Sequence, residues 1–242
     1  MEVLQLPSAC LAGDTMVFCR GIVSGLLPVD DGIATGEMIA RLPEAQRPAR
    51  LLSFAAVSWA ELHDELVTLF VRPDGWIEGF GKGRNPGAVD LSAIRFGIDR
   101  GISLVDEVRL HTCDFDGVRV VALQGHLAAR CFKSERTGAS LAPLPKFCKP
   151  RGELSFVVAG ERADHFHLLL LQPLLEKAGV NNRSRTGGEV VWCDALWESE
   201  CAKINLTGVF FPTAVDVMQL SRDDGGLQTA LRKRIVLKEF QT

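Results

Sequence analysis

The sequence predicts an all-β fold made of two tandem antiparallel β-sandwich modules of jelly-roll type. Three observations predict it: short apolar runs are separated by turn residues along the whole chain, one thirteen-residue stretch occurs twice, and a Pro-Asp-Gly turn joins two of the apolar runs. Short strands separated by such turns are typical of sandwiches and barrels, and not of alternating strand–helix folds.

The repeated stretch is LPEAQRPARLLSF at residues 42–54, which returns as LPKFCKPRGELSF at residues 144–156. Six of its thirteen positions are identical, including both prolines and the closing Leu-Ser-Phe, which is far more than random pairing produces. Self-similarity of this kind indicates that each copy is one folding unit.

Two further anchors extend the alignment. VDLSAIRF at residues 89–96 aligns with INLTGVFF at 204–211, and CRGIV at 19–23 aligns more weakly with LQGHL at 123–127. The offset between copies is 102 residues at the repeated stretch and 115 at VDLSAIRF, so the second copy carries 13 extra residues between these anchors.

The first copy is expected to form strands wherever β-branched and apolar residues run between turn signals. Pro43 ends one of these strands, and Pro73-Asp74-Gly75 forms a reverse turn that returns the chain as a hairpin. The predicted strands are residues 16–23, 37–43, 51–59, 65–71, 76–80 and 89–98, and their counterparts in the second copy are 117–127, 152–160, 165–173 and 203–211.

Two regions depart from this pattern. Residues 173–199 contain the insertion, and we expect a short helical turn ending at Gly179 followed by a polar loop. The C-terminal segment places Leu227, Leu231 and Ile235 on one face of a predicted amphipathic helix, although RIVLKEF is equally consistent with a last strand. The predicted modules are residues 1–103 and 104–242.

Composition narrows the class of protein. The chain has 242 residues, 47% of them apolar, and a net charge of −3, which predicts a soluble protein with no general attraction to nucleic acid. No apolar run is long enough for a membrane helix, and the N-terminus lacks the basic start of a signal peptide. Seven irregularly spaced cysteines predict reduced, mostly buried thiols and an intracellular location, in the cytosol or an organelle lumen, with an extracellular one left open.

Candidate chemical sites are few. His165 and His167 have the spacing of a metal-binding pair, but the expectation is two solvent-facing histidines at a sheet edge, because no third ligand is evident. The glycine-rich segment around Lys82 and Arg84 resembles an anion cradle, but it leads into a strand and not a helix, which favours a hairpin loop. CDFDG and RDDGG lack the closing glutamate of a calcium loop and are expected to be turns. We therefore expect no metal and no cofactor.

The order of these motifs resembles a small β-sandwich repeat of phage tail and receptor-binding proteins, and of tandem-repeat proteins of algae and dinoflagellates. The second copy keeps the Leu-Pro, Lys-Pro and Leu-Ser-Phe elements but has Gln172-Pro173 in place of the Pro-Asp-Gly turn. The resemblance implies trimerisation, attachment or scaffold units, some of which bind glycans. In the first copy the residues that carry it are Gly21, Leu42, Pro43, Arg47, Pro48, Phe54, Pro73, Asp74, Gly75 and Leu91.

The function predicted from these observations is that of a non-catalytic structural or interaction protein, an assembly or accessory subunit that binds protein partners or itself. A glycan-binding attachment module is the alternative, although the chain has four tryptophans and no tyrosine. A hydrolase with a Cys/His or Ser/His site is less favoured, because no G-x-S-x-G motif occurs. Partner contacts are predicted where the copies differ: Trp192, Trp197, Lys82, Arg84, Leu227, Leu231, Arg232 and Arg234.

Overall fold

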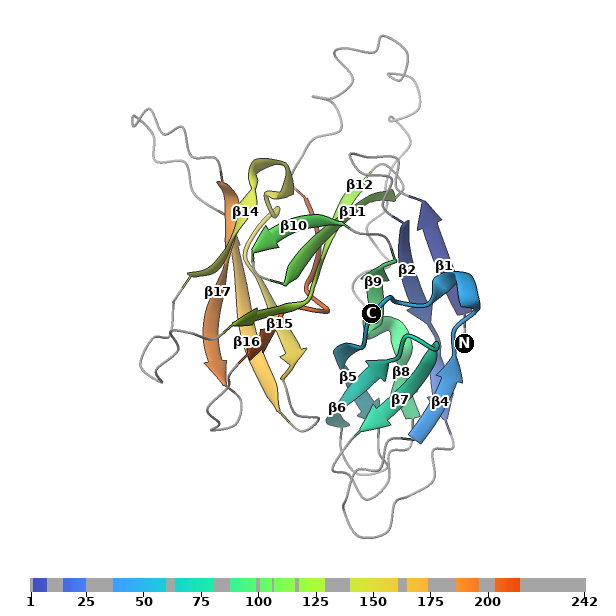
Figure 1. The fold of residues 1–242 in the computed structure, drawn as a ribbon. Helices are drawn as coiled ribbons and strands as arrows, with labels where there is room; N and C mark the ends of the chain where they lie inside the picture. The colour runs from blue at the N-terminus through green and yellow to red at the C-terminus, as the bar shows by residue number, and fades with distance from the viewer. Residues whose placement is uncertain are drawn as a thin grey trace, which may run out of the picture.

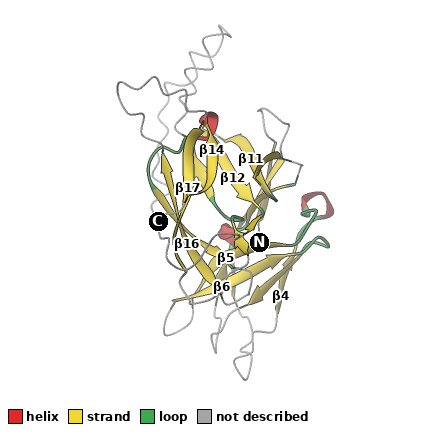
Figure 2. Cartoon of the chain, turned by 60° about the vertical axis from the view of Figure 1, so that its left-hand side comes forward, coloured by secondary structure: helices red, strands yellow, loops and turns green. Residues whose placement is uncertain are grey.

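The computed structural model shows an all-β protein (Figure 1; Figure 2). The residues that it describes are 2–7, 15–24, 37–59, 64–80, 88–98, 101–105, 107–115, 118–128, 140–160, 165–173, 186–195 and 203–213. Within these ranges the chain forms 19 strands and three short 3-10 segments, with no α-helix, and every strand pairing is antiparallel.

The first copy builds two sheets. A three-stranded sheet has the order β1-β2-β9, and a six-stranded sheet, β3-β8-β5-β6-β7-β4, curls into a nearly closed barrel. Their strands are β1 (Glu2–Pro7), β2 (Thr15–Arg20), β3 (Ile22–Ser24), β4 (Glu37–Arg41), β5 (Leu52–Trp59), β6 (Asp64–Val71), β7 (Trp76–Phe80), β8 (Ala88–Asp90) and β9 (Arg95–Gly97).

The second copy builds three sheets, with the orders β10-β11-β12-β19, β13-β18 and β14-β17-β16-β15. In the first copy β8 pairs with both β3 and β5, whereas its counterpart in the second copy, β18, pairs with β13 and not with β15. The equivalent of the six-stranded sheet is therefore divided into two sheets. The strands are β10 (Ile102–Val105), β11 (Val108–Phe115), β12 (Val118–Gln124), β13 (His126–Ala128), β14 (Ser140–Pro145), β15 (Leu154–Ala159), β16 (Phe166–Pro173), β17 (Thr186–Ala195), β18 (Lys203–Asn205) and β19 (Phe210–Pro212).

Strand register shows that the two copies repeat the same topology. In the first, Ala40 of β4 lies opposite Ile77 of β7, directly after a register shift; in the second, Ala142 of β14 lies opposite Val190 of β17, again directly after a shift. The β2–β9 and β12–β19 ladders also match, since Val17 pairs with Phe96 and Val121 with Phe211.

A glycine at the same place in each copy separates two strands that the sequence predicted as one. Gly21 and Gly125 have φ values of 115° and 126°, which an L side chain rarely adopts, so the chain turns there. Their carbonyl oxygens accept hydrogen bonds from the N–H of Leu91 (3.0 Å) and Leu206 (2.8 Å). The predicted strand 16–23 is therefore wrong in its continuity, and the weak third sequence anchor is a true structural equivalence.

The predicted strand 89–98 is also interrupted. Leu91–Ala93 forms a 3-10 turn, capped by the Asp90 carboxylate, which accepts from the N–H of Ser92 at 2.8 Å. Side-chain capping competes with extended structure at such positions, which alternation alone does not reveal.

The repeated Leu-Pro stretch forms a corner between β4 and β5. Leu42 is 1% exposed, and its N–H donates to the carbonyl of Gly75 (2.8 Å), in the turn between β6 and β7. Arg47 Nε donates to the carbonyl of Leu42 (3.3 Å). A 3-10 segment, Glu44–Gln46, lies between them, and Lys146–Cys148 repeats it in the second copy. The stretch is therefore structural.

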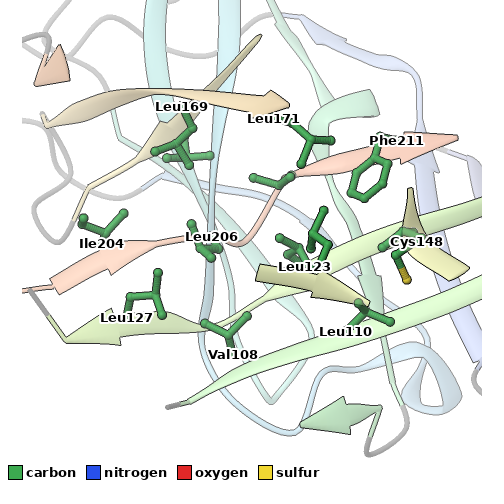
Figure 3. Close-up of a cluster of buried hydrophobic side chains, with 14 residues drawn as sticks. Val108, Leu110, Leu123, Leu127, Cys148, Leu169, Leu171, Ile204, Leu206 and Phe211 are labelled. Atoms are coloured by element: carbon green, nitrogen blue, oxygen red, sulfur yellow. The ribbon is translucent and has the colours of Figure 1, made fainter. Parts of the chain in front are cut away.

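Each copy has its own apolar core. One cluster includes Phe54, Leu69 and Phe96 of the first copy, and the other includes Leu110, Leu169 and Phe211 of the second (Figure 3). The module division predicted between residues 103 and 104 falls inside β10, which pairs with β11 of the second copy.

The insertion prediction for residues 173–199 needs a correction. Residues 186–195 are not part of a polar loop but form β17, a ten-residue strand that pairs with β16 and β14. The 13 extra residues lie between Leu171 and Val190, since these two pair as Val71 and Ile77 pair across a short turn in the first copy, and the ladder of β16 and β17 continues beyond them to Pro173 and Gly188. The predicted helical turn falls on residues outside those described, as does the predicted C-terminal helix.

Candidate interaction surfaces

The two copies pack against each other through equivalent faces of β2 and β12. Met16 of β2 forms one cluster with Cys113, Val120 and Ala122 of the second copy, all at most 7% exposed. Two aromatic rings extend this cluster: Phe18 and Phe210 meet edge to face, with 5.4 Å between the ring centroids. The guanidinium carbon of Arg95 lies 4.8 Å from the centroid of the Phe210 ring. The face of each strand that turns away from its own core thus forms the interface.

A buried amide reinforces this contact. Asn205 is 0% exposed and its Nδ2 donates to the Ser53 carbonyl at 2.9 Å and to Ser53 Oγ at 2.8 Å. Its Oδ1 accepts from the N–H of Thr207 at 2.9 Å, which caps the turn after β18. The equivalent residue of the first copy is Asp90, which caps its turn in the same way but has no N–H to donate. Asparagine at position 205 therefore serves both purposes.

Backbone atoms complete the interface. Arg50 Nη2 donates to the carbonyls of Glu107 and Gln124, both at 3.2 Å, and Gln124 Oε1 accepts from the N–H of Gly97 at 3.2 Å. The imidazole of His111 packs directly on the Cα of Gly97, where a methyl group would collide with it. These contacts, of which the hydrogen bond between Gly97 and Gln124 is buried, join the two copies.

A second apolar surface is exposed to solvent. In β5, Phe54 and Ala56 point into the core, so Val57 and Trp59 point outward. Leu66 of β6 lies opposite Val57, and the β3–β8 ladder places Ile22 on the same outer face. We call Ile22, Val57, Trp59 and Leu66 the outer patch; their exposed fractions are 61%, 39%, 38% and 38%.

The outer patch is specific to the first copy. At the positions equivalent to Val57 and Leu66, the second copy has Ala159 and Phe166, which are buried at 0% and 4% exposure. The position equivalent to Ile22 is His126. Antiparallel sheets that face water normally carry polar residues on that face. Val57, Trp59 and Leu66 on the paired strands β5 and β6, with Ile22 two strands away from β5, are therefore a candidate interaction surface.

The histidine pair does not form the predicted solvent-facing edge. His167 lies opposite Val158 and is 1% exposed, in phase with the core residues Leu169 and Leu171. Burial, with a smaller contribution from neighbouring His165, lowers the pKa of His167 to about 4. Across the part of the chain that the structure describes, no three His, Cys, Asp or Glu residues are placed to hold a metal ion.

Three cysteines whose side chains the structure describes, Cys19, Cys113 and Cys148, have buried thiols that form no disulfide. Burial raises the pKa of Cys19 and Cys148 to about 12 and that of Cys113 to about 11. Such thiols are protonated at neutral pH and are poor nucleophiles. The prediction of reduced, buried thiols is confirmed for these three residues.

The predicted partner-binding residues are mostly untested. Trp192 lies in β17, where its backbone pairs with Leu169 of β16. The remaining seven lie outside the described residues: Trp197, Lys82, Arg84, Leu227, Leu231, Arg232 and Arg234. None of the four outer-patch residues was predicted. The available signal was ELVTLFV, in which apolar residues occupy both phases of the strand alternation.

Comparison with known proteins gives no family for the chain, so its function has to be inferred from the surfaces described above. No family model, no curated protein and no solved structure matches the chain. In the described residues, no helix has the length and apolarity needed to cross a membrane.

Proposed function

We propose that the chain is a non-catalytic interaction protein, an assembly or accessory subunit built from two tandem β-sandwich-type modules, and that the outer patch is its docking surface for a protein partner. The observation that carries this proposal is the set of apolar side chains exposed on the outer face of β3, β5 and β6. Tryptophan is among the residues that contribute most of the affinity of protein interfaces, and Trp59 belongs to the patch.

The rim of the patch indicates the partner's chemistry. Asp64 lies directly opposite Trp59, and Asp90 directly opposite Ile22. An apolar centre with acidic neighbours is complementary to a surface with apolar side chains and flanking Lys or Arg. The expected partner is therefore a protein with a basic, apolar contact surface.

The test uses a pair of matched variants. Val57 and Val157 are both strand valines at 39% exposure, but only Val57 belongs to the outer patch. Partners that co-purify with the tagged protein from its source cells should be lost with Val57→Asp and kept with Val157→Asp. Equal recovery of every partner with both variants would refute the docking surface.

Trp59 supports glycan binding as a second candidate function. Its ring is 38% exposed and lies opposite the exposed Asp64, and sugars stack on such rings while a carboxylate accepts from their hydroxyl groups. A glycan array probed with wild type and Trp59→Ala would separate the two functions, because only a lectin would give sugar signals that depend on Trp59.

A further inference from the structure

The outer patch raises the question of what covers it, since the largest exposed apolar patch of a soluble protein is often a functional interaction surface. The two charged residues directly opposite its members are both acids, Asp64 and Asp90. An occupant with apolar and basic residues fits this surface. A segment of the chain itself has that composition.

That segment is LQTALRKRIVLKEF, residues 227–240. It contains seven apolar residues and four basic ones against a single acid. It lies outside the described residues, so only its sequence enters the argument. Leu227, Leu231 and Ile235 recur at a spacing of four, which places them on one face of a helix. The alternative strand RIVLKEF has three consecutive apolar residues between charged ones.

The segment can reach the patch within one molecule. The last described residue, Thr213, is fixed to the second copy, because its N–H donates to the carbonyl of Arg119 at 2.8 Å. Thirteen residues then separate it from Leu227. Extended, they span roughly 45 Å, which matches the diameter of a compact chain of this length, roughly 45 Å.

We propose that residues 227–240 occupy the outer patch of their own molecule and that a partner has to displace them. This inference rests on the proposed function and adds its regulation. A tether whose relaxed length matches the span gives an effective concentration of about 1 mM, at which an intrinsic dissociation constant of about 0.1 mM masks the patch in roughly nine molecules of ten. The partner's apparent affinity then falls about tenfold.

The experiment measures binding of a fluorescently labelled synthetic peptide of residues 227–240 to full-length proteins by anisotropy. The wild type is compared with a variant whose own segment cannot dock, Leu231→Asp combined with Ile235→Asp. We expect the peptide to bind this variant about tenfold more tightly than wild type. Adding Val57→Asp should abolish the binding, whereas adding Val157→Asp should leave it unchanged.

Two results would overturn the inference: equal peptide affinity for the wild type and the double variant, or peptide binding that survives Val57→Asp. Leu66→Gln replaces Val57→Asp if circular dichroism shows that the latter is unfolded. Light scattering over a range of protein concentrations completes the test, because a dimer that is lost in the double variant would show that the segment docks on a second molecule. Failure here is distinct from failure of the proposed function, since co-purified partners would still depend on Val57.

Discussion

Exchange of Asn205 for aspartate tests whether one buried amide joins the two copies. The carboxylate of Asn205→Asp can still cap the N–H of Thr207, as Asp90 caps Ser92 in the first copy. It cannot donate, so it places a negative charge 2.9 Å from the Ser53 carbonyl oxygen at a position that is 0% exposed. The local turn should therefore survive while the contact between copies is weakened.

The magnitude follows from these contacts. Leaving a buried acceptor without its donor costs about 1–3 kcal/mol, and the buried charge adds to this. We expect Asn205→Asp to lower the free energy of unfolding at pH 7 by about 3 kcal/mol, or the melting temperature by about 6–12 °C. Because burial raises the folded-state pKa of the new carboxyl above its unfolded value of about 3.9, the loss should shrink as the pH falls toward 3.5.

Urea unfolding at pH 7 and pH 3.5, followed by circular dichroism, measures both effects. The reciprocal exchange Asp90→Asn is the control, because Asn keeps an oxygen that can accept from the N–H of Ser92. Its effect should stay below about 1 kcal/mol. The reasoning is refuted if both exchanges lower the stability equally at pH 7.

Three further outcomes are expected. Gly97→Ala should lower the free energy of unfolding, measured in urea, by about 2 kcal/mol because its methyl group would collide with the His111 ring. Gly152→Ala should leave it unchanged because the space around Gly152 is open. Equal effects of the two exchanges would contradict this. The free energy of unfolding of the wild type should fall by about 3 kcal/mol between pH 6.5 and about pH 4, because His167 binds a proton in the unfolded state and not in the folded state. His167→Gln should remove this dependence on pH. An unchanged dependence in the variant would exclude His167 as its source. Cys148, with its pKa raised to about 12, should resist iodoacetamide at pH 8 until urea is added, and rapid labelling of the native protein would show that it is accessible.

Much of the fold follows from local sequence. The alternation in LSFAAVSW, the Pro-Asp-Gly turn and the Leu-Pro corner each specify their conformation through neighbouring residues, so β5, the β6–β7 hairpin and the repeat are predictable. The breaks at Gly21 and Leu91 were not predicted. They depend on the positive φ of Gly21, on the local cap between Asp90 and Ser92, and on the long-range hydrogen bond from the N–H of Leu91 to the Gly21 carbonyl. Periodicity records none of these.

The exposed surface depends on tertiary structure. Val57 and Leu169 are both apolar strand residues, yet Val57 is 39% exposed and Leu169 is buried. Strand alternation assigns a residue to one of two faces, but it does not say which face another element covers. That choice is made by long-range packing, in which equivalent faces of β2 and β12 meet and the outer face of β3, β5 and β6 keeps four apolar side chains exposed at the patch. The sequence by itself determined the duplication and most strands of the first copy, whereas tertiary packing decided where strands break and which apolar residues remain exposed.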